Sequence, residues 1–66
     1  MIDLDLLDSA IKTSGMSYKH LAKVLGISLT SFYNKRSGKT EFNASELHLL
    51  LEEIRAPQEV RAKIFA

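Results

Sequence analysis

Side chains that can hold a polyanion are concentrated in the middle of this 66-residue chain, between residues 16 and 40. This stretch has five lysines and arginines and no aspartate or glutamate, so its formal charge is +5. The segments before and after it each carry −2, which leaves +1 for the whole chain. Ammonium and guanidinium groups without neighbouring carboxylates attract phosphate, so the local charge indicates a phosphate-facing surface. An ordinary solvated face is the plainer interpretation, but it does not explain the absence of acids.

Two short capped helices are predicted within the same stretch, over residues 18–25 and 29–36. Ser17 and Ser28 are suitable N-caps, and Gly26 can adopt the left-handed conformation that ends the first helix. The residues expected to face inward are Leu21, Ala22, Leu25, Ile27 and Phe32. Two helices joined by a tight turn in this way are typical of a helix-turn-helix, whose second helix enters the DNA major groove.

Three further helices are expected around this pair, and the sequence shows no strand pattern. The first covers residues 3–13, the fourth begins after the capping box formed by Asn43 and Glu46, and the fifth opens at Pro57. The apolar residues expected in the core of these segments are Leu4, Leu7, Ala10, Ile11, Phe42, Leu47, Leu50, Leu51 and Ile54. Because the connections are short, we expect an all-α, compact five-helix bundle in one domain, residues 1–66.

Other classes of protein are disfavoured. The chain has no cysteine for disulfides or thiolate metal sites, and His20 and His48 lie on different predicted helices without metal-ligand spacing. No glycine-rich phosphate loop or nucleophile motif is present. We therefore expect no catalytic residues, no metal and no cofactor. The acidic N-terminus does not resemble a signal peptide and no apolar run approaches membrane-spanning length, so we expect a cytoplasmic protein that does not bind membranes.

The central stretch resembles the helix-turn-helix of the lambda-repressor and Cro-like family. The matching residues are Leu21, Ala22, Leu25, Gly26, Ile27, Ser28, Phe32 and Gly38. Residues 38–46 also resemble small phage regulators of Gram-positive hosts, in which a Gly-Lys-x-Glu-Phe segment precedes a short helix. The resemblance implies a transcriptional repressor in the cytoplasm of a bacterium or a phage-infected host. Such a protein binds a palindromic double-stranded DNA operator as a homodimer, and no small-molecule ligand is expected.

By the geometry of that family, the base-reading side chains are Leu29, Thr30, Tyr33 and Asn34. The amide of Asn34 can bond adenine through two hydrogen bonds, which makes it the best candidate for direct recognition. Thr30 can bond a base edge, Leu29 can contact a thymine methyl, and Tyr33 can reach a base or a phosphate. Two large side chains placed outward, Leu29 and Tyr33, are not explained by an ordinary solvated helix.

Phosphate contacts are expected from a second set of residues around the third helix. The set comprises Ser17, Tyr18, Lys19, Lys35, Arg36, Ser37, Lys39 and Thr40. The resemblance implies that the loop with Lys39 and Thr40 grips the DNA backbone, whereas Ser17 offers a hydroxyl at a helix N-terminus.

The chain departs from the family pattern in three respects. The family usually has glutamine where Tyr18 stands and an apolar residue where Lys35 stands. It often pairs a basic residue of the first helix with a glutamate of the third, where this chain has Ile11 and Arg36. We therefore expect that ion pair to be absent and Arg36 to be available for phosphate. The stem of Lys35 is expected to cover the core while its amine reaches solvent or phosphate.

The C-terminal segment is the predicted dimer surface. Its apolar residues Val60, Ile64 and Phe65, with Leu49 before them, exceed what a small core is expected to hold. Two alternatives use the same surface: an antitoxin-like protein whose apolar tail binds a toxin, and a protein-interaction module with little or no DNA binding.

Overall fold

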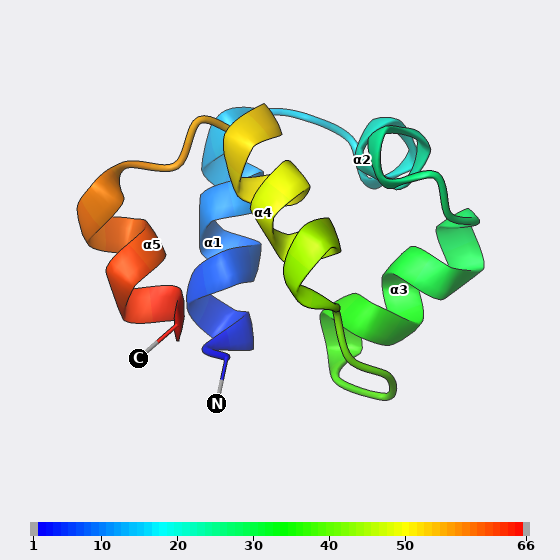
Figure 1. The fold of residues 1–66 in the computed structure, drawn as a ribbon. Helices are drawn as coiled ribbons and strands as arrows, with labels where there is room; N and C mark the ends of the chain where they lie inside the picture. Colours follow the sequence, from blue (N-terminus) through cyan, green and yellow to red (C-terminus); the bar gives the residue numbers. More distant parts are fainter. Residues whose placement is uncertain (1, 66) are drawn as a thin grey trace.

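The computed structural model describes residues 2–65, which form five helices and no strand. The helices are α1 (Leu4–Ser14), α2 (Tyr18–Leu25), α3 (Leu29–Ser37), α4 (Ala44–Glu53) and α5 (Gln58–Phe65). In Figure 1, α1 and α4 lie in the middle, α5 lies on one side of them, and α2 and α3 lie on the other. The predicted all-α class and the five helices are thus confirmed.

Side-chain caps mark the starts of the first four helices, and those of α2, α3 and α4 are the predicted ones. At the start of α1, Asp3 accepts a hydrogen bond from the Leu6 amide at 3.0 Å. Ser17 and Ser28 cap α2 and α3 in the same way, and Asn43 and Glu46 form the predicted capping box of α4. Each such cap contributes about 1 kcal/mol to helix stability. Gly26 has φ +72° and closes α2, so the turn before α3 needs only three residues.

All five helices contribute to one core. The buried apolar residues are Leu7, Ile11, Leu21, Ala22, Phe32, Phe42, Leu47, Leu50, Leu51, Ile54, Ala56 and Ile64. Phe32 is fully buried and meets the ring of Phe42 edge to face, with centroids 5.9 Å apart. The prediction that Phe42 belongs to the core is confirmed. Leu25 and Ile27 are half-buried and pack against the same core.

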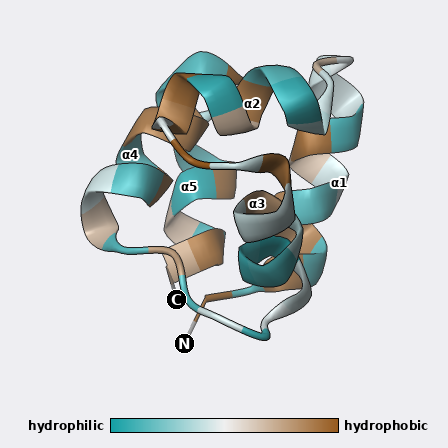
Figure 2. Cartoon of the chain, turned by 90° about the vertical axis from the view of Figure 1, so that its right-hand side faces the viewer, coloured by the Kyte–Doolittle hydropathy of each residue, from teal (hydrophilic) through white to brown (hydrophobic). Residues whose placement is uncertain are grey.

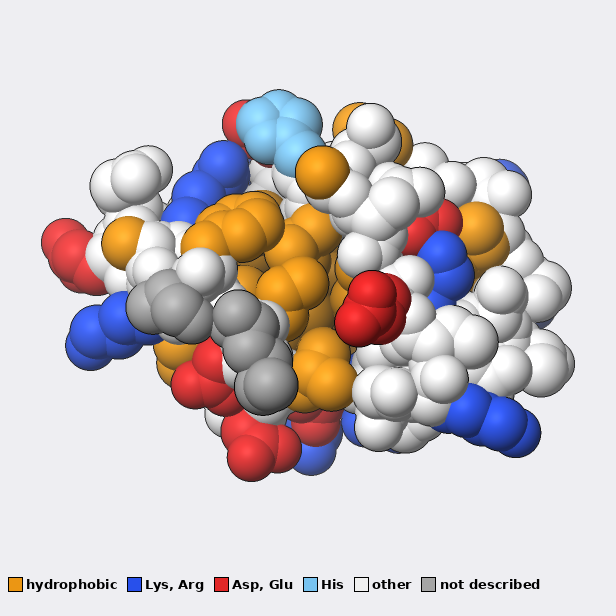
Figure 3. Space-filling view, turned by 60° about the horizontal axis from the view of Figure 1, so that its bottom comes forward, with side chains coloured by type: hydrophobic (Ala, Val, Ile, Leu, Met, Phe, Trp, Pro, Cys, Tyr) orange, Lys and Arg blue, Asp and Glu red, His pale blue; other side chains and the backbone are white. Residues whose placement is uncertain are grey.

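The last turn of α5 lies against the start of α1, where the Asp3 amide donates to the Ile64 carbonyl at 3.0 Å. Ile64 is fully buried, so its prediction as a surface contact is wrong: this turn completes the core of the single chain. Val60 is half-buried and packs on the core, whereas Phe65 is 54% exposed. Figure 3 shows an apolar area at this end of the molecule, with acidic side chains around it. None of the helices within residues 2–65 is long and apolar enough to cross a membrane.

Candidate functional site

α3 presents the predicted base-reading residues on the outside of the bundle. Because Phe32 is buried in the core, the rotation of α3 about its axis is fixed, and Thr30 and Tyr33 are exposed. Leu29 and Asn34 are half-buried at the edges of the same surface. In Figure 2 α3 faces the viewer, and its residues are more hydrophobic near its start than in its last turn. We call Leu29, Thr30, Tyr33 and Asn34 the reading face.

An open groove of about 460 Å³ joins one end of the reading face to the start of α2. Leu29 and Tyr33 line it from α3, and Ser17, Tyr18 and Lys19 line it from α2 and its N-cap. The structure therefore brings two predicted base-reading residues together with three residues predicted to contact phosphate. At the N-terminus of α2, amide groups without intrahelical partners add to the positive charge of Lys19.

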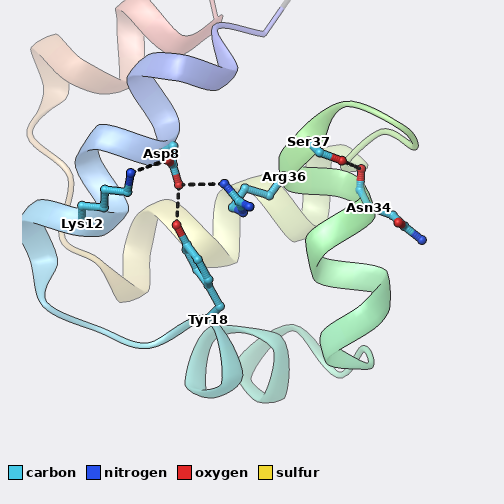
Figure 4. A network of polar contacts seen from close by, with 6 residues as sticks. All are labelled: Asp8, Lys12, Tyr18, Asn34, Arg36 and Ser37. Carbon is cyan, nitrogen blue, oxygen red and sulfur yellow. Dashed lines mark hydrogen bonds and ion pairs between the residues drawn. The ribbon is translucent and has the colours of Figure 1, made fainter.

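The loop after α3 is attached to the other end of the reading face. The amides of Lys39 and Thr40 donate to the Asn34 carbonyl at 2.9 and 3.2 Å, and the Ser37 hydroxyl donates to it at 3.2 Å. Lys39 and Thr40 are exposed, and Figure 4 shows the Asn34 amide pointing away from α1. Residues predicted to hold phosphate are thus fixed relative to the best candidate for base recognition.

Arg36 is not available as predicted. Its Nη1 lies 3.5 Å from Asp8 Oδ1, and its guanidinium carbon lies 4.8 Å from the centroid of the Tyr18 ring (Figure 4). Its Nε is buried and has no acceptor among residues 2–65. No ion pair can form between the positions of Ile11 and Arg36, but Arg36 is paired from another position of α1, Asp8. The acid of this pair lies on α1 and the cation on α3.

Tyr18 is likewise turned inward. Its hydroxyl donates to Asp8 Oδ1 at 2.7 Å, and Lys12 Nζ lies 3.2 Å from Asp8 Oδ2. The hydrogen bond from Tyr18 lowers the pKa of Asp8, with Lys12 and Arg36 adding to the effect. The same bond, together with burial, raises the pKa of Tyr18. At neutral pH the carboxylate is therefore charged, and the phenol is a proton donor bound within the protein rather than a group facing phosphate.

Lys35 differs from its prediction in the same way. Its amine bonds Glu46 Oε1, and the two side chains are only 15% and 13% exposed. Glu46 Oε1 also accepts the Asn43 amide at 2.9 Å, and these two bonds, that of Lys35 first, lower the pKa of Glu46. The expectation that the amine reaches solvent or phosphate is wrong, because the capping box of α4 places a carboxylate within its reach.

Asp8 and Glu46 are the residues of this region that the sequence analysis did not identify. The only sequence signal for Asp8 is an acid on the first helix one turn before Ile11, the position that the resemblance relates to Arg36. Glu46 was assigned only to its cap. Within residues 2–65 no three histidine or acidic side chains gather as a metal site. No family model matches the chain, and no match to it is found among the curated proteins or the solved structures.

Proposed function

We propose that this protein binds double-stranded DNA by sequence, with α2 and α3 acting as a helix-turn-helix and α3 in the major groove. In this proposal it is a cytoplasmic transcriptional repressor of the Cro type rather than an enzyme. The reading face selects base pairs, and Ser17, Lys19, Lys39 and Thr40 hold the backbone on either side. Tyr18, Lys35, Arg36 and Ser37 are left out of the phosphate set because their polar groups are bonded within the protein. The Ser17 hydroxyl stays in the set because its oxygen accepts the His20 amide and its hydrogen can still be donated.

The observation that carries the proposal is the groove in which Leu29 and Tyr33 meet Ser17 and Lys19. Apolar and aromatic side chains suited to base edges are there adjacent to a helix N-terminus and a lysine suited to phosphate. In the loop after α3, on the other side of Asn34, the exposed Lys39 provides a second cation suited to phosphate. A major groove about 12 Å wide admits one α-helix, and α3 is the helix that carries this surface.

Selection of bound duplexes from a randomised library tests the proposal directly. We expect an enriched sequence whose affinity falls steeply as salt rises, because phosphate contacts release counterions. Asn34→Ala should reduce discrimination at one base pair of the selected site by about 1–3 kcal/mol. Ser45→Ala, a small change on the exposed first turn of α4, is the control and should leave the selected sequence unchanged. Binding that is undetectable, or insensitive to salt, would contradict the proposal.

We also propose that two copies bind together on DNA. Phe65 is exposed, and its neighbour Ile64 accepts the amide of Asp3, which lies between two residues, Ile2 and Leu4, that line an open groove together with Phe42. The chain extends 29, 23 and 19 Å along its principal axes, so two copies in contact can address half-sites about 34 Å apart. Sedimentation with the selected duplex should show two coupled chains, and Phe65→Ser should weaken the coupling. One uncoupled chain per half-site would exclude a dimer.

The protein-interaction and antitoxin-like alternatives are favoured by one observation, the exposure of Leu49 and Phe65. Both functions need these apolar side chains. The interaction module does not need the reading face, so the library selection separates it from the repressor. The antitoxin-like protein is the DNA-binding half of a toxin–antitoxin pair, whose tail binds a toxin and not a second copy, so the sedimentation experiment separates it.

A further inference from the structure

Asp8 is the point at which three helices of the protein meet. Its carboxylate on α1 accepts the Tyr18 hydroxyl from α2 at 2.7 Å and lies 3.5 Å from Arg36 Nη1 on α3 (Figure 4). Lys12, one turn further along α1, approaches the second carboxylate oxygen at 3.2 Å. We call Asp8, Tyr18 and Arg36 the three-helix cluster.

The three-helix cluster reaches the reading face through Tyr33. The Tyr18 and Tyr33 rings meet edge to face, with centroids 5.8 Å apart and planes at 88°. The Arg36 guanidinium, 4.8 Å from the Tyr18 centroid, is also 5.9 Å from that of Tyr33. Both contacts have the geometry of favourable aromatic and cation–π pairs. The position of the Tyr33 ring therefore depends on two side chains that Asp8 holds.

We propose that Asp8 is a positioning residue for DNA recognition: through Tyr18 and Arg36 it fixes where the Tyr33 ring stands on the reading face. This inference rests on the proposed function. It assigns part of the sequence preference to a residue of α1, a helix that contributes nothing to the reading face itself.

The composition of the cluster favours positioning over stability alone. Ion pairs that are partly removed from water contribute little net stability compared with apolar side chains of similar size. The cluster also leaves Arg36 Nε buried without an acceptor among residues 2–65, which a purely stabilising arrangement would avoid. Directional bonds do restrict the geometry of the groups they join, and here those groups are the two that contact Tyr33.

The position of the Tyr33 ring can be followed without DNA, because Tyr18 and Tyr33 are the only tyrosines in the chain. Nuclear Overhauser contacts between the two rings, and the ring-proton shifts of Tyr33, report the packing in the whole protein. Asp8→Asn should weaken these contacts and shift the Tyr33 resonances. Asp5→Asn, which removes the same charge from an exposed position of α1, should leave them as in the unchanged protein. Unchanged Tyr33 resonances in Asp8→Asn would overturn the inference.

Tyr18→Phe keeps the test available if Asp8→Asn does not fold. It retains the ring, removes only the hydroxyl bond to Asp8, and leaves Tyr33 as the single tyrosine. We expect the Tyr33 resonances of this variant to shift in the same direction as those of Asp8→Asn. Resonances identical to those of the unchanged protein would show that the Asp8 bond does not control the ring.

The consequence for recognition is measured by the library selection. Tyr33→Ala first identifies the base pairs whose preference depends on Tyr33. At those base pairs Asp8→Asn should lose about 3- to 10-fold of the preference, with the other base pairs unchanged, whereas Asp5→Asn should select the original sequence. A uniform loss across the site would indicate a structural role alone and would overturn the inference.

The outcomes separate this inference from the proposed function. If the unchanged protein selects no sequence, the proposed function fails whatever the Tyr33 resonances show. If it selects a sequence, and Asp8→Asn moves the ring without changing the preference, the proposed function stands and only the inference about Asp8 fails.

Discussion

Two pairs of cations surround the recognition helix proposed here, and the structure treats them differently. Lys35 and Arg36, in the last turn of α3, are paired with Glu46 and Asp8. Lys19 and Lys39, on either side of α3, are exposed. All four belong to the same acid-free stretch and are equivalent in any count of charge. The charge of a sequence segment is therefore an upper bound on the charge that it offers to a partner.

The two pairs also serve different parts of the molecule. The bonds of Lys35 and Arg36 attach the end of α3 to α4 and α1, so they hold the reading face in place. Lys19 and Lys39 face solvent, where a phosphate can replace water at little cost. Removing one member of a partly buried ion pair lowers the stability of the protein more, because the remaining charge is left in a poorly solvated place. Removing an exposed cation changes the stability little.

Replacing Lys35 should have the largest effect of the substitutions that test this difference. Lys35→Ala removes the cation beside Glu46 and the stem that covers the core, and should lower the free energy of unfolding by about 1–3 kcal/mol. For a domain of this size each kcal/mol corresponds to about 4–8 °C in melting temperature. Lys39→Ala is the matched control and should change stability by less than about 0.5 kcal/mol. Thermal and urea denaturation followed by circular dichroism measure both, and equal losses would remove the distinction between the pairs.

Acid should weaken the protein through the carboxylates that hold these cations. The pKa of Asp8 is lowered chiefly by the Tyr18 hydroxyl, and the pKa of Glu46 chiefly by Lys35. A lowered folded-state pKa means that the unfolded chain binds more protons, so stability rises with pH in this range. The contribution is complete above the ordinary values near pH 4 and is lost as pH falls through the lowered ones. Urea unfolding between pH 6 and pH 2 should show this loss, and Asp8→Asn should flatten it. Parallel curves for the two proteins would contradict the assignment.

The fold was largely predictable because its signals are local. Ser17, Ser28 and Asn43 cap helices through bonds that span three residues, and Gly26 ends α2 by its own backbone conformation. Such interactions depend on sequence neighbours, so their pattern can be recognised without knowing the rest of the structure. The buried positions of Leu21 and Phe32 follow from helical spacing in the same way.

The errors concern contacts between residues far apart in the chain. Arg36 and Asp8 are separated by 28 positions, and Lys35 and Glu46 by 11, so no local pattern identifies either pair. The prediction for Arg36 also relied on a resemblance that considered only position 11 of the first helix, whereas the partner of Arg36 is Asp8. Ile64 was predicted on the dimer surface because the apolar residues of the C-terminal segment exceed what a small core is expected to hold, whereas α5 turns it into the core beside Asp3. Each of these outcomes depends on how the helices pack together.

Substitution of the exposed cations, Lys19 and Lys39, should change DNA binding more than it changes stability. If Lys39 neutralises one phosphate, Lys39→Ala should reduce the slope of log affinity against log salt by about 0.9, equivalent to about fivefold in affinity at 0.15 M salt. The loss should be the same for every duplex, because a phosphate contact carries no base preference. Lys35→Ala, measured where it is fully folded, should keep the original slope. Fluorescence anisotropy over a salt series gives both values, and a reduced slope for Lys35→Ala would place its amine on the DNA.

The substitution with the smallest expected effect on stability is His20→Ala. It tests whether the stability lost on removing a side chain depends on its having an acidic partner or on its burial. His20 Nε2 lies 2.9 Å from Glu53 Oε2, which is closer than Arg36 lies to Asp8. These two side chains are nevertheless 49% and 35% exposed. If a partner alone determined the effect, His20→Ala would destabilise the protein as Lys35→Ala does. Because solvent screens exposed pairs, we expect a change within about 0.5 kcal/mol, close to that of Lys39→Ala. Urea unfolding at pH 7 can resolve the two cases. A loss above about 1 kcal/mol would show that the α2–α4 contact at His20 belongs with the buried pairs, and that proximity to an acid outweighs exposure in this protein.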